Sequence, residues 1–271
     1  MLLCLAVFAV EVKAAKVDTV ETYSDAMKKK IKAVIVTPDG YGQGNTEYPV
    51  VYLLHGAGGN YASWIKSQSK LREGADQYKF IIVCPDGGVT SWYWDSPVDP
   101  TYKYETYVAK ELVAFIDKTY KTIKSPKGRA ITGYSMGGHG GLWLGIRHQD
   151  VFGAAGATSG GVDIRPFPKN WDMAKRLGSY AENPENWEKY TVTNILNLLT
   201  PNSLAIIFDC GTDDFFYKVN NELHEKMEER NIAHDYISRP GGHTFTYWAN
   251  AINYQFVYFD TFFKKPAAPV R

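Results

Sequence analysis

The chain has neither an excess of charge nor a framework of cysteines. Lys and Arg total 30 against 29 Asp and Glu, a formal net charge of +1, so nothing in the charge balance argues for a nucleic-acid partner. There are only 3 cysteines, with no H-E-x-x-H motif and no paired C-x-x-C, so we predict no metal site and no cofactor. Hydrophobic residues make up 45% and charged residues 22%, which is typical of a globular protein.

Long hydrophobic runs are also absent, and no membrane span is expected. The apolar run at residues 1–10 is too short to cross a bilayer and is followed by the small residues Ala14 and Ala15. This arrangement is typical of a signal peptide, so we expect one at residues 1–15 and a secreted or periplasmic protein. The remaining residues, 16–271, are expected to form a single domain. The alternative for residues 1–15 is a buried N-terminal strand.

Short apolar runs alternate with amphipathic segments along the chain. The runs lie at residues 49–54, 80–84, 129–132, 154–158 and 204–208. Continuous apolar strands without alternation are typical of a sheet that is covered on both faces. Helical patterns between them, such as Val219, Leu223 and Met227 at four-residue intervals, favour parallel strands joined by crossovers. Residues 17–24 and 32–37 have no helix between them and are expected to pair antiparallel at the edge.

Two of the cysteines end expected strands. Cys84 ends the fourth and Cys210 the seventh, while Cys4 lies in the expected signal peptide. Three other strands should separate Cys84 from Cys210, and at a spacing of about 4.8 Å per strand they are too far apart for a disulfide. We therefore predict two buried free thiols.

The segment 162–200 interrupts the alternation between the sixth and seventh strands. It is too long for a simple crossover and carries Trp171 and Trp187. Two interpretations stay open, a small inserted cap and a decorated surface segment.

The strongest local motif is GYSMG at residues 133–137. It lies between a strand that ends at Thr132 and a helical segment, which is the context of the G-x-S-x-G nucleophile elbow. The helix that begins beside the serine favours negative charge developing there. The motif predicts the α/β-hydrolase fold, with a mostly parallel eight-stranded sheet flanked by helices, and Ser135 as the nucleophile.

A serine nucleophile needs a base, and the base needs an acid to orient it. In this fold the order along the chain is Ser, then Asp or Glu, then His. His243 lies in a glycine-rich loop after the last expected strand, at the sheet edge where active sites gather, and is the predicted base. Asp213 and Asp214 both follow the seventh strand. The usual spacing from Gly211 favours Asp214 as the acid, and Asp213 is the alternative.

Four other histidines follow the serine, and none is expected to act as the base: His139, His148, His224 and His234.

The oxyanion hole of this fold takes one backbone N–H from the residue after the serine and one from the loop after the third strand. We predict Met136 for the first and Ala57 for the second, with Gly56 as the alternative to Ala57. His55 is expected to have a structural role. Neither G-x-G-x-x-G nor the Walker pattern is present, so the glycines of this loop do not indicate a nucleotide site.

Five motifs in the right order resemble the esterase D group of α/β hydrolases. They are HGAGGN, PDGG, GYSMGG, FDCGTDD and RPGGHTFTYW. The group includes feruloyl and acetyl esterases, S-formylglutathione hydrolases and mycolyltransferases, and the resemblance covers about residues 34–263. It implies Ser135, Asp214 and His243 as the triad, with Met136 and Ala57 at the oxyanion hole. The segment SWYWDS at residues 91–96 resembles an aromatic stretch that such esterases carry beside the acyl site.

These features favour a serine ester hydrolase that acts through an acyl-enzyme and removes feruloyl or acetyl groups from plant polysaccharide such as xylan. Trp92, Trp94 and Trp171 are the predicted substrate-binding residues, because aryl and sugar rings stack on aromatic faces; ordinary packing is the alternative. The expected signal peptide argues against a cytosolic S-formylglutathione hydrolase. The sequence does not exclude a mycolyl-type acyltransferase, and a binding module built on an inactive hydrolase fold is a third interpretation. The sequence gives no prediction of oligomeric state.

Overall fold

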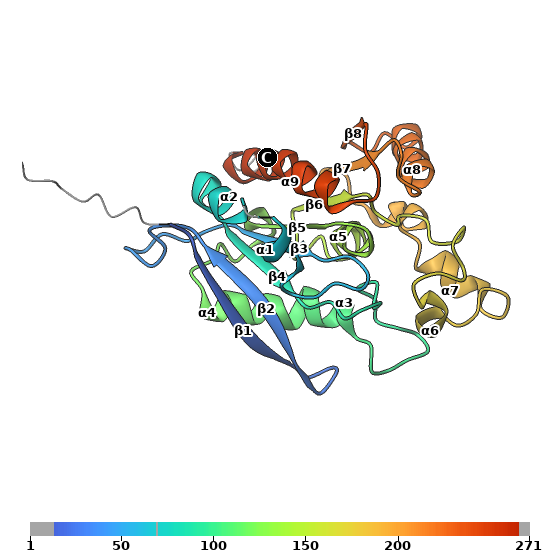
Figure 1. The fold of residues 1–271 in the computed structure, drawn as a ribbon, viewed down its shortest axis with the longest axis horizontal. Coiled ribbons are helices and arrows are strands. Elements are labelled where there is room, and N and C mark those ends of the chain that lie inside the picture. The colour runs from blue at the N-terminus through green and yellow to red at the C-terminus, as the bar shows by residue number, and fades with distance from the viewer. Residues whose placement is uncertain (1–13, 69, 266–271) are drawn as a thin grey trace, which may run out of the picture.

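The computed structural model describes residues 14–68 and 70–265, which form one eight-stranded sheet with helices on both faces (Figure 1). The spatial order of the strands is β1-β2-β4-β3-β5-β6-β7-β8. Their bounds are β1 (Lys16–Ser24), β2 (Lys29–Thr37), β3 (Val50–Leu54), β4 (Ile81–Pro85), β5 (Arg129–Gly133), β6 (Ala154–Thr158), β7 (Ala205–Gly211) and β8 (Asp235–Arg239). The predicted α/β-hydrolase fold is confirmed. Residues 1–13 of the expected signal peptide, with Cys4, lie outside the described residues.

Two hydrophobic cores, one on each face of the sheet, explain why the central strands are mainly apolar. Every residue of β3, β4, β5 and β6 is buried. One face packs against α1 (Ser63–Ser67), α2 (Leu71–Tyr78) and α9 (Phe245–Lys264). The other packs against α3 (Tyr104–Thr106), the π-helix η1 (Tyr107–Leu112), α4 (Val113–Thr119), α5 (Met136–Arg147) and α8 (Tyr217–Glu229). Strands buried on both faces need no polar alternation.

The N-terminal strands form an antiparallel edge, as predicted. β1 pairs with β2 along its whole length, from Lys16 opposite Thr37 to Ser24 opposite Lys29. β2 also runs antiparallel to β4, and all remaining pairs are parallel. The second strand begins at Lys29, three residues before its expected start, because residues 29–31 pair with the last three residues of β1. In the described part of the chain no helix is both long and apolar enough to cross a membrane.

The two described cysteines are buried free thiols, which confirms that prediction. Cys84 lies in β4 and Cys210 in β7, and β3, β5 and β6 separate the two strands. Burial raises the pKa of both thiols well above the ordinary value. Neither thiol is therefore primed for nucleophilic chemistry.

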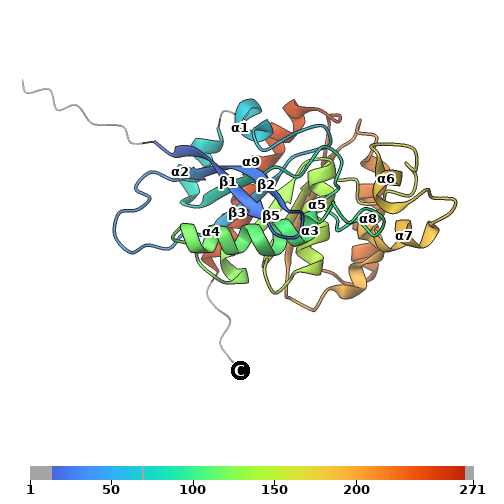
Figure 2. The same cartoon turned by 90° about the horizontal axis from the view of Figure 1, so that it is seen from below.

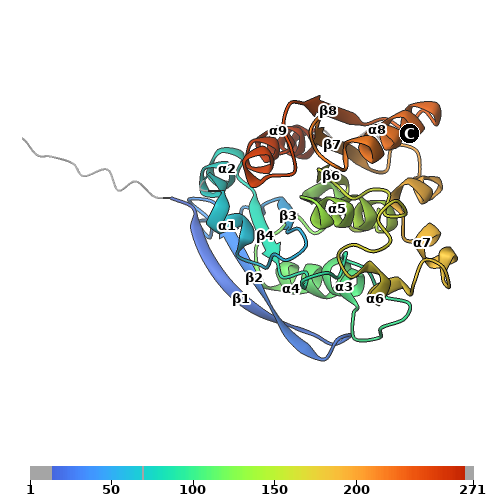
Figure 3. The same cartoon turned by 45° about the vertical axis from the view of Figure 1, so that its right-hand side comes forward.

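The insert between β6 and β7 contains α6 (Met173–Leu177), α7 (Pro184–Lys189) and two 3₁₀ turns, η3 (Val192–Asn194) and η4 (Leu196–Leu198). In all three views α6 and α7 lie at the end of the molecule away from α1 and α2 (Figure 1, Figure 2 and Figure 3).

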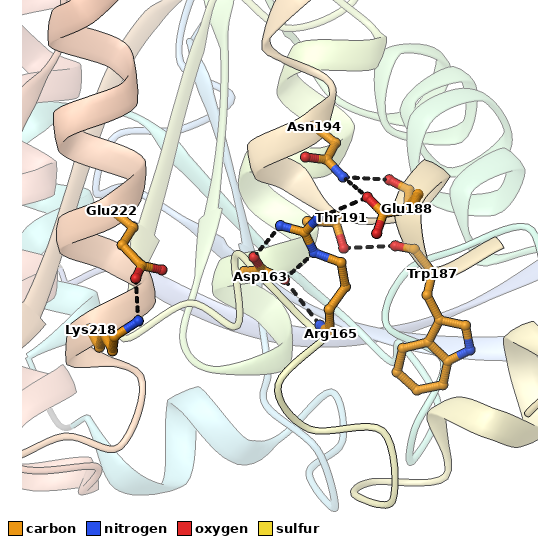
Figure 4. A network of polar contacts seen from close by, with 8 residues as sticks. All are labelled: Asp163, Arg165, Trp187, Glu188, Thr191, Asn194, Lys218 and Glu222. Carbon is orange, nitrogen blue, oxygen red and sulfur yellow. Dashed lines mark hydrogen bonds and ion pairs between the residues drawn. The ribbon is translucent and has the colours of Figure 1, made fainter. Parts of the chain in front are cut away.

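Ion pairs hold this insert together (Figure 4). Arg165 donates from Nε (2.9 Å) and Nη2 (2.6 Å) to the carboxylate of Asp163, and from Nη1 to Glu188 (2.8 Å) on α7. Asn194 donates to the same carboxylate of Glu188 at 2.6 Å. A bidentate Arg–carboxylate pair combines strength with fixed geometry, so the start of the insert is tied to its later helix.

Candidate active site

The nucleophile elbow follows directly from the packing around two glycines. Ser135, between β5 and α5, has φ 57° and ψ −119°, a strained conformation for a residue with a side chain. A Cβ on Gly133 would lie 2.4 Å from the carbonyl oxygen of Leu54, and a Cβ on Gly137 would lie 2.5 Å from the same atom. The turn can therefore form only with glycine at both positions, and it presents the serine side chain at the carboxyl edge of the sheet.

Hydrogen bonds connect the three residues that were predicted as the triad. The Ser135 hydroxyl lies 2.9 Å from His243 Nε2, and His243 Nδ1 lies 2.8 Å from a carboxylate oxygen of Asp214. The other oxygen of Asp214 accepts the N–H of Phe216 at 2.8 Å, and the carboxylate is buried. Asp213 is exposed, whereas Asp214, the residue favoured by the spacing from Gly211, contacts the histidine. In the tautomer with Nδ1–H donating to Asp214, His243 Nε2 is free to accept the serine proton.

The predicted oxyanion-hole donors are the backbone N–H groups of Ala57 and Met136. Neither Ala57 nor Met136 uses its N–H in a hydrogen bond to a protein acceptor within residues 14–68 and 70–265. Residues 56–59 and Ser135 line the same cavity of about 500 Å³. Met136 is the first residue of α5, so its N–H also carries the positive end of the helix dipole.

His55 is a structural residue, as expected. Its Nε2 accepts the N–H of Gly87 at 2.8 Å, and its Nδ1–H donates to the carbonyl of Gly56 at 2.8 Å. Burial lowers the pKa of the imidazole, which keeps it neutral and suited to this pairing. The side chain thus joins the loop that carries Ala57 to the loop after β4.

The four other histidines after Ser135 all have partners of their own. The Nε2 of His139 accepts the indole N–H of Trp94 at 2.8 Å, and burial lowers the pKa of His139 to about 4. His148 contacts Glu105 at 2.9 Å, and the rings of His224 and His234 hydrogen-bond one another at 2.8 Å.

The prediction that Trp92 and Trp94 bind substrate is wrong. Their exposed fractions are 1% and 0%, and the two rings stack on each other with centroids 5.6 Å apart. The chain turns sharply at this point, with φ of 56° at Trp92, and both indoles pack in the core against His139. Trp171 is different, because it lines the cavity in front of Ser135.

The structure adds two site residues that the sequence did not reveal, Phe215 and Trp248, both lining the cavity. Phe215 is 50% exposed, and its ring centroid lies 4.2 Å from that of His243. It also stacks with Trp171, with centroids 5.8 Å apart and an interplanar angle of 22°. Trp248 approaches His243 edge-on at 4.9 Å. The signal for Phe215 was its position next to Asp214, and for Trp248 its position one turn into the helix after His243.

Comparison with known proteins also indicates an esterase. A profile of the family described as "Putative esterase" matches residues 24–259. Esterase Rv1288 of Mycobacterium tuberculosis is 27% identical over 243 residues, which cover 78% of this chain and 52% of that relative. The chain therefore spans about half the length of this relative. An acetyl esterase of Caldicellulosiruptor saccharolyticus is 26% identical over 217 residues, which cover 73% of this chain and 78% of that protein.

Among solved structures, a ferulic acid esterase superimposes with a TM-score of 0.77 and 30% sequence identity, covering 93% of this chain and 99% of that chain. The resemblance to the esterase group that includes feruloyl esterases is thereby confirmed.

Proposed function

The chain belongs to this esterase family, and on that premise we propose that it is a serine carboxylic ester hydrolase that works through an acyl-enzyme on Ser135. The observation that carries the proposal is the unbroken chain of hydrogen bonds from Ser135 through His243 to Asp214, at 2.9 Å and 2.8 Å. A buried carboxylate, an imidazole and a serine in this order make up the machinery of acyl transfer. This mechanism requires no metal or cofactor.

The chemistry takes two steps. In the first, Ser135 Oγ attacks the ester carbonyl while its proton passes to His243 Nε2, and the departing alcohol then takes that proton. In the second, a water molecule attacks the acyl-serine, giving its proton to the same nitrogen, and the carboxylic acid leaves as the Ser135 hydroxyl is restored. The N–H groups of Ala57 and Met136 stabilise the oxyanion in both steps. Such donors typically contribute about 10²–10³ each in kcat.

The aromatic side chains around the serine support an acyl group that can stack. Trp171 and Phe215 form one wall of a cavity of about 500 Å³ that opens in front of Ser135. Offset stacking on such a wall favours a planar aryl acyl group such as ferulate. The similarity to a ferulic acid esterase and to an acetyl esterase supports feruloyl or acetyl esters of plant polysaccharide such as xylan as the substrate class.

Export remains part of the proposal. The support is the apolar run at residues 1–10 followed by Ala14 and Ala15, which is typical of a signal peptide. Intact mass of the protein recovered from the medium or periplasm tests it. A chain that begins near residue 16 is the expected result, and an uncleaved chain retained in the cytoplasm would contradict it.

A substrate panel tests the proposed activity. Methyl ferulate, acetylated xylan, p-nitrophenyl acetate and S-formylglutathione are compared by kcat/KM, with Ser135→Ala as the matched inactive variant. We expect one of the first two to be preferred and the variant to lose about 10⁶ in kcat. A preference for the thioester by orders of magnitude would overturn the polysaccharide assignment. Acyl transfer to a trehalose-like sugar, detected by product analysis, would point to a transferase instead.

A further inference from the structure

A second buried carboxylate lies close to the triad but takes no part in it. Asp209, in β7, is 1% exposed. One of its oxygens accepts the amide N–H of Gln255 at 2.8 Å and the hydroxyl of Thr158 at 3.1 Å. A carboxylate buried without full pairing carries a large desolvation penalty, so its presence here calls for a functional explanation.

Gln255 extends this contact across the sheet. It is fully buried on α9, and its amide nitrogen also donates to the hydroxyl of Thr158 (2.8 Å) and to the carbonyl of Ala157 (3.0 Å) on β6. Its amide oxygen accepts the hydroxyl of Thr132 on β5. One glutamine therefore connects α9 to the carboxyl ends of β5, β6 and β7.

Three of these elements, β5, β7 and α9, adjoin a member of the triad along the chain. Thr132 comes three residues before Ser135, and Asp209 five residues before Asp214. α9 begins two residues after His243. The link to the elbow is also direct, because the backbone N–H of Ser135 donates to the carbonyl of Thr158 at 3.0 Å.

Two further side chains, those of Arg239 and Tyr247, contribute to the charge environment of Asp209. The guanidinium of Arg239, at the end of β8, lies 3.9 Å from the other carboxylate oxygen, which has no hydrogen-bond partner among the described residues. The phenol of Tyr247 on α9 also faces the pair, and the guanidinium lies over its ring at 5.0 Å. Burial raises the pKa of Asp209 to about 6, opposed by Gln255 and by the charge of Arg239. Carboxyl groups perturbed in this way gather at functional sites.

We propose that Asp209 and Gln255 are positioning residues, which hold the strand ends that carry Ser135 and Asp214 in register with the helix that follows His243. The proposal rests on these three residues being the triad. It explains why a costly buried charge lies where an apolar side chain would pack, because three chain segments meet there that must be aligned to within a fraction of an ångström. A displacement of about 1 Å at a reacting group can lower a rate by about 10²-fold.

Two isosteric changes and one matched control test this role. Asp209→Asn removes the charge, and Gln255→Met removes the hydrogen bonds at similar volume. The control is Asp117→Asn, which breaks the partly buried ion pair between Asp117 on α4 and Arg129 at the opposite end of β5. Gln255→Met and Asp117→Asn should both destabilise the fold, but only Asp209→Asn and Gln255→Met disturb the carboxyl ends of the strands.

The readouts are kcat, KM and the low-field proton resonance of the His243 Nδ1–H that faces Asp214. We expect Asp209→Asn and Gln255→Met to lower kcat at least about tenfold with KM changed less than about twofold, and to shift or broaden that resonance. The control should leave kcat and the resonance unchanged. If one of the two variants does not fold, the other is judged by the same criteria.

Wild-type kcat in both variants would overturn the proposal, and so would an equal loss of kcat in the control, because activity would then follow global stability. Ser135→Ala separates this failure from a failure of the triad. If that variant keeps wild-type activity, the triad assignment is wrong whatever Asp209 does. If it is inactive while Asp209→Asn is fully active, only the positioning role is wrong.

Discussion

Replacing Asp209 by asparagine should change how the stability of the protein depends on pH. Burial raises the pKa of this carboxyl from 3.8 to about 6. Between those two values the native state holds a proton that the unfolded chain has released. The free energy of unfolding therefore falls as the pH rises through this window. The stabilisation is fully present below pH 4, and it is lost as the pH passes about 6.

The size of the effect follows from the shift. A difference of about 2 pKa units, at about 1.4 kcal/mol for each unit, corresponds to about 3 kcal/mol. Asparagine does not titrate in this range, so the free energy of unfolding of the variant lacks this pH-dependent contribution. Because part of this change already occurs at pH 4, the wild type should lose about 2–3 kcal/mol relative to Asp209→Asn between pH 4 and pH 7.

Urea unfolding of both proteins at pH 4, 5, 6 and 7, followed by tryptophan fluorescence, measures this difference. Subtracting the free energy of unfolding of one protein from that of the other at each pH cancels the contributions of all other titrating groups. A difference that stays constant within about 1 kcal/mol over the whole range would refute the reasoning. It would mean that Arg239 and the hydrogen bonds of Gln255 keep the buried carboxyl ionised even in acid.

Three further changes test separate parts of the site. Phe215→Ala should lower kcat/KM for methyl ferulate about tenfold and leave p-nitrophenyl acetate within about threefold, because the feruloyl acyl group loses a stacking partner that an acetyl group does not use. The similarly exposed Tyr23→Ala, on the edge strand β1 and outside the cavity, is the control and should alter neither. Gly133→Ala should cost about 1–3 kcal/mol of stability in urea titrations and abolish activity, because the new Cβ meets the carbonyl of Leu54; a fully active variant would contradict the tight elbow. His55→Leu should lower kcat about tenfold or more on all esters, because it removes the hydrogen bonds that fix the loop carrying Ala57. An unchanged kcat would show that this loop keeps its conformation without His55.

The parts of the structure that could be predicted are those that local chemistry dictates. Strands covered on both faces need no polar alternation, and the mainly apolar runs that result located β3 to β7 along the chain. The elbow could be recognised because its two glycines are required by contacts with the carbonyl of Leu54. His243 could be found from its place in the loop after the last strand, and the four other histidines after Ser135 each have a hydrogen-bond partner of their own.

The parts that could not be predicted depend on how loops fold back on the sheet. Trp92 and Trp94 have the composition of an aromatic binding surface, and only the turn at Trp92, with φ of 56°, shows that both indoles point into the core. Phe215 stands next to Asp214 in the sequence, yet its contact with His243 exists only after the loops following β7 and β8 come together. Asp209 has the pattern of an ordinary strand residue, because its partners lie on β6, β8 and α9, far away in the sequence.

The most direct test of the account is to trap the covalent intermediate. The protein is inactivated with a fluorophosphonate ester, and peptide mapping by mass spectrometry locates the adduct. We expect one adduct per chain, on Ser135, forming in step with the loss of esterase activity, and no adduct in Ser135→Ala. An adduct on another residue that accounts for the inactivation, or esterase activity of Ser135→Ala within about tenfold of wild type, would contradict the assignment of Ser135 as the nucleophile.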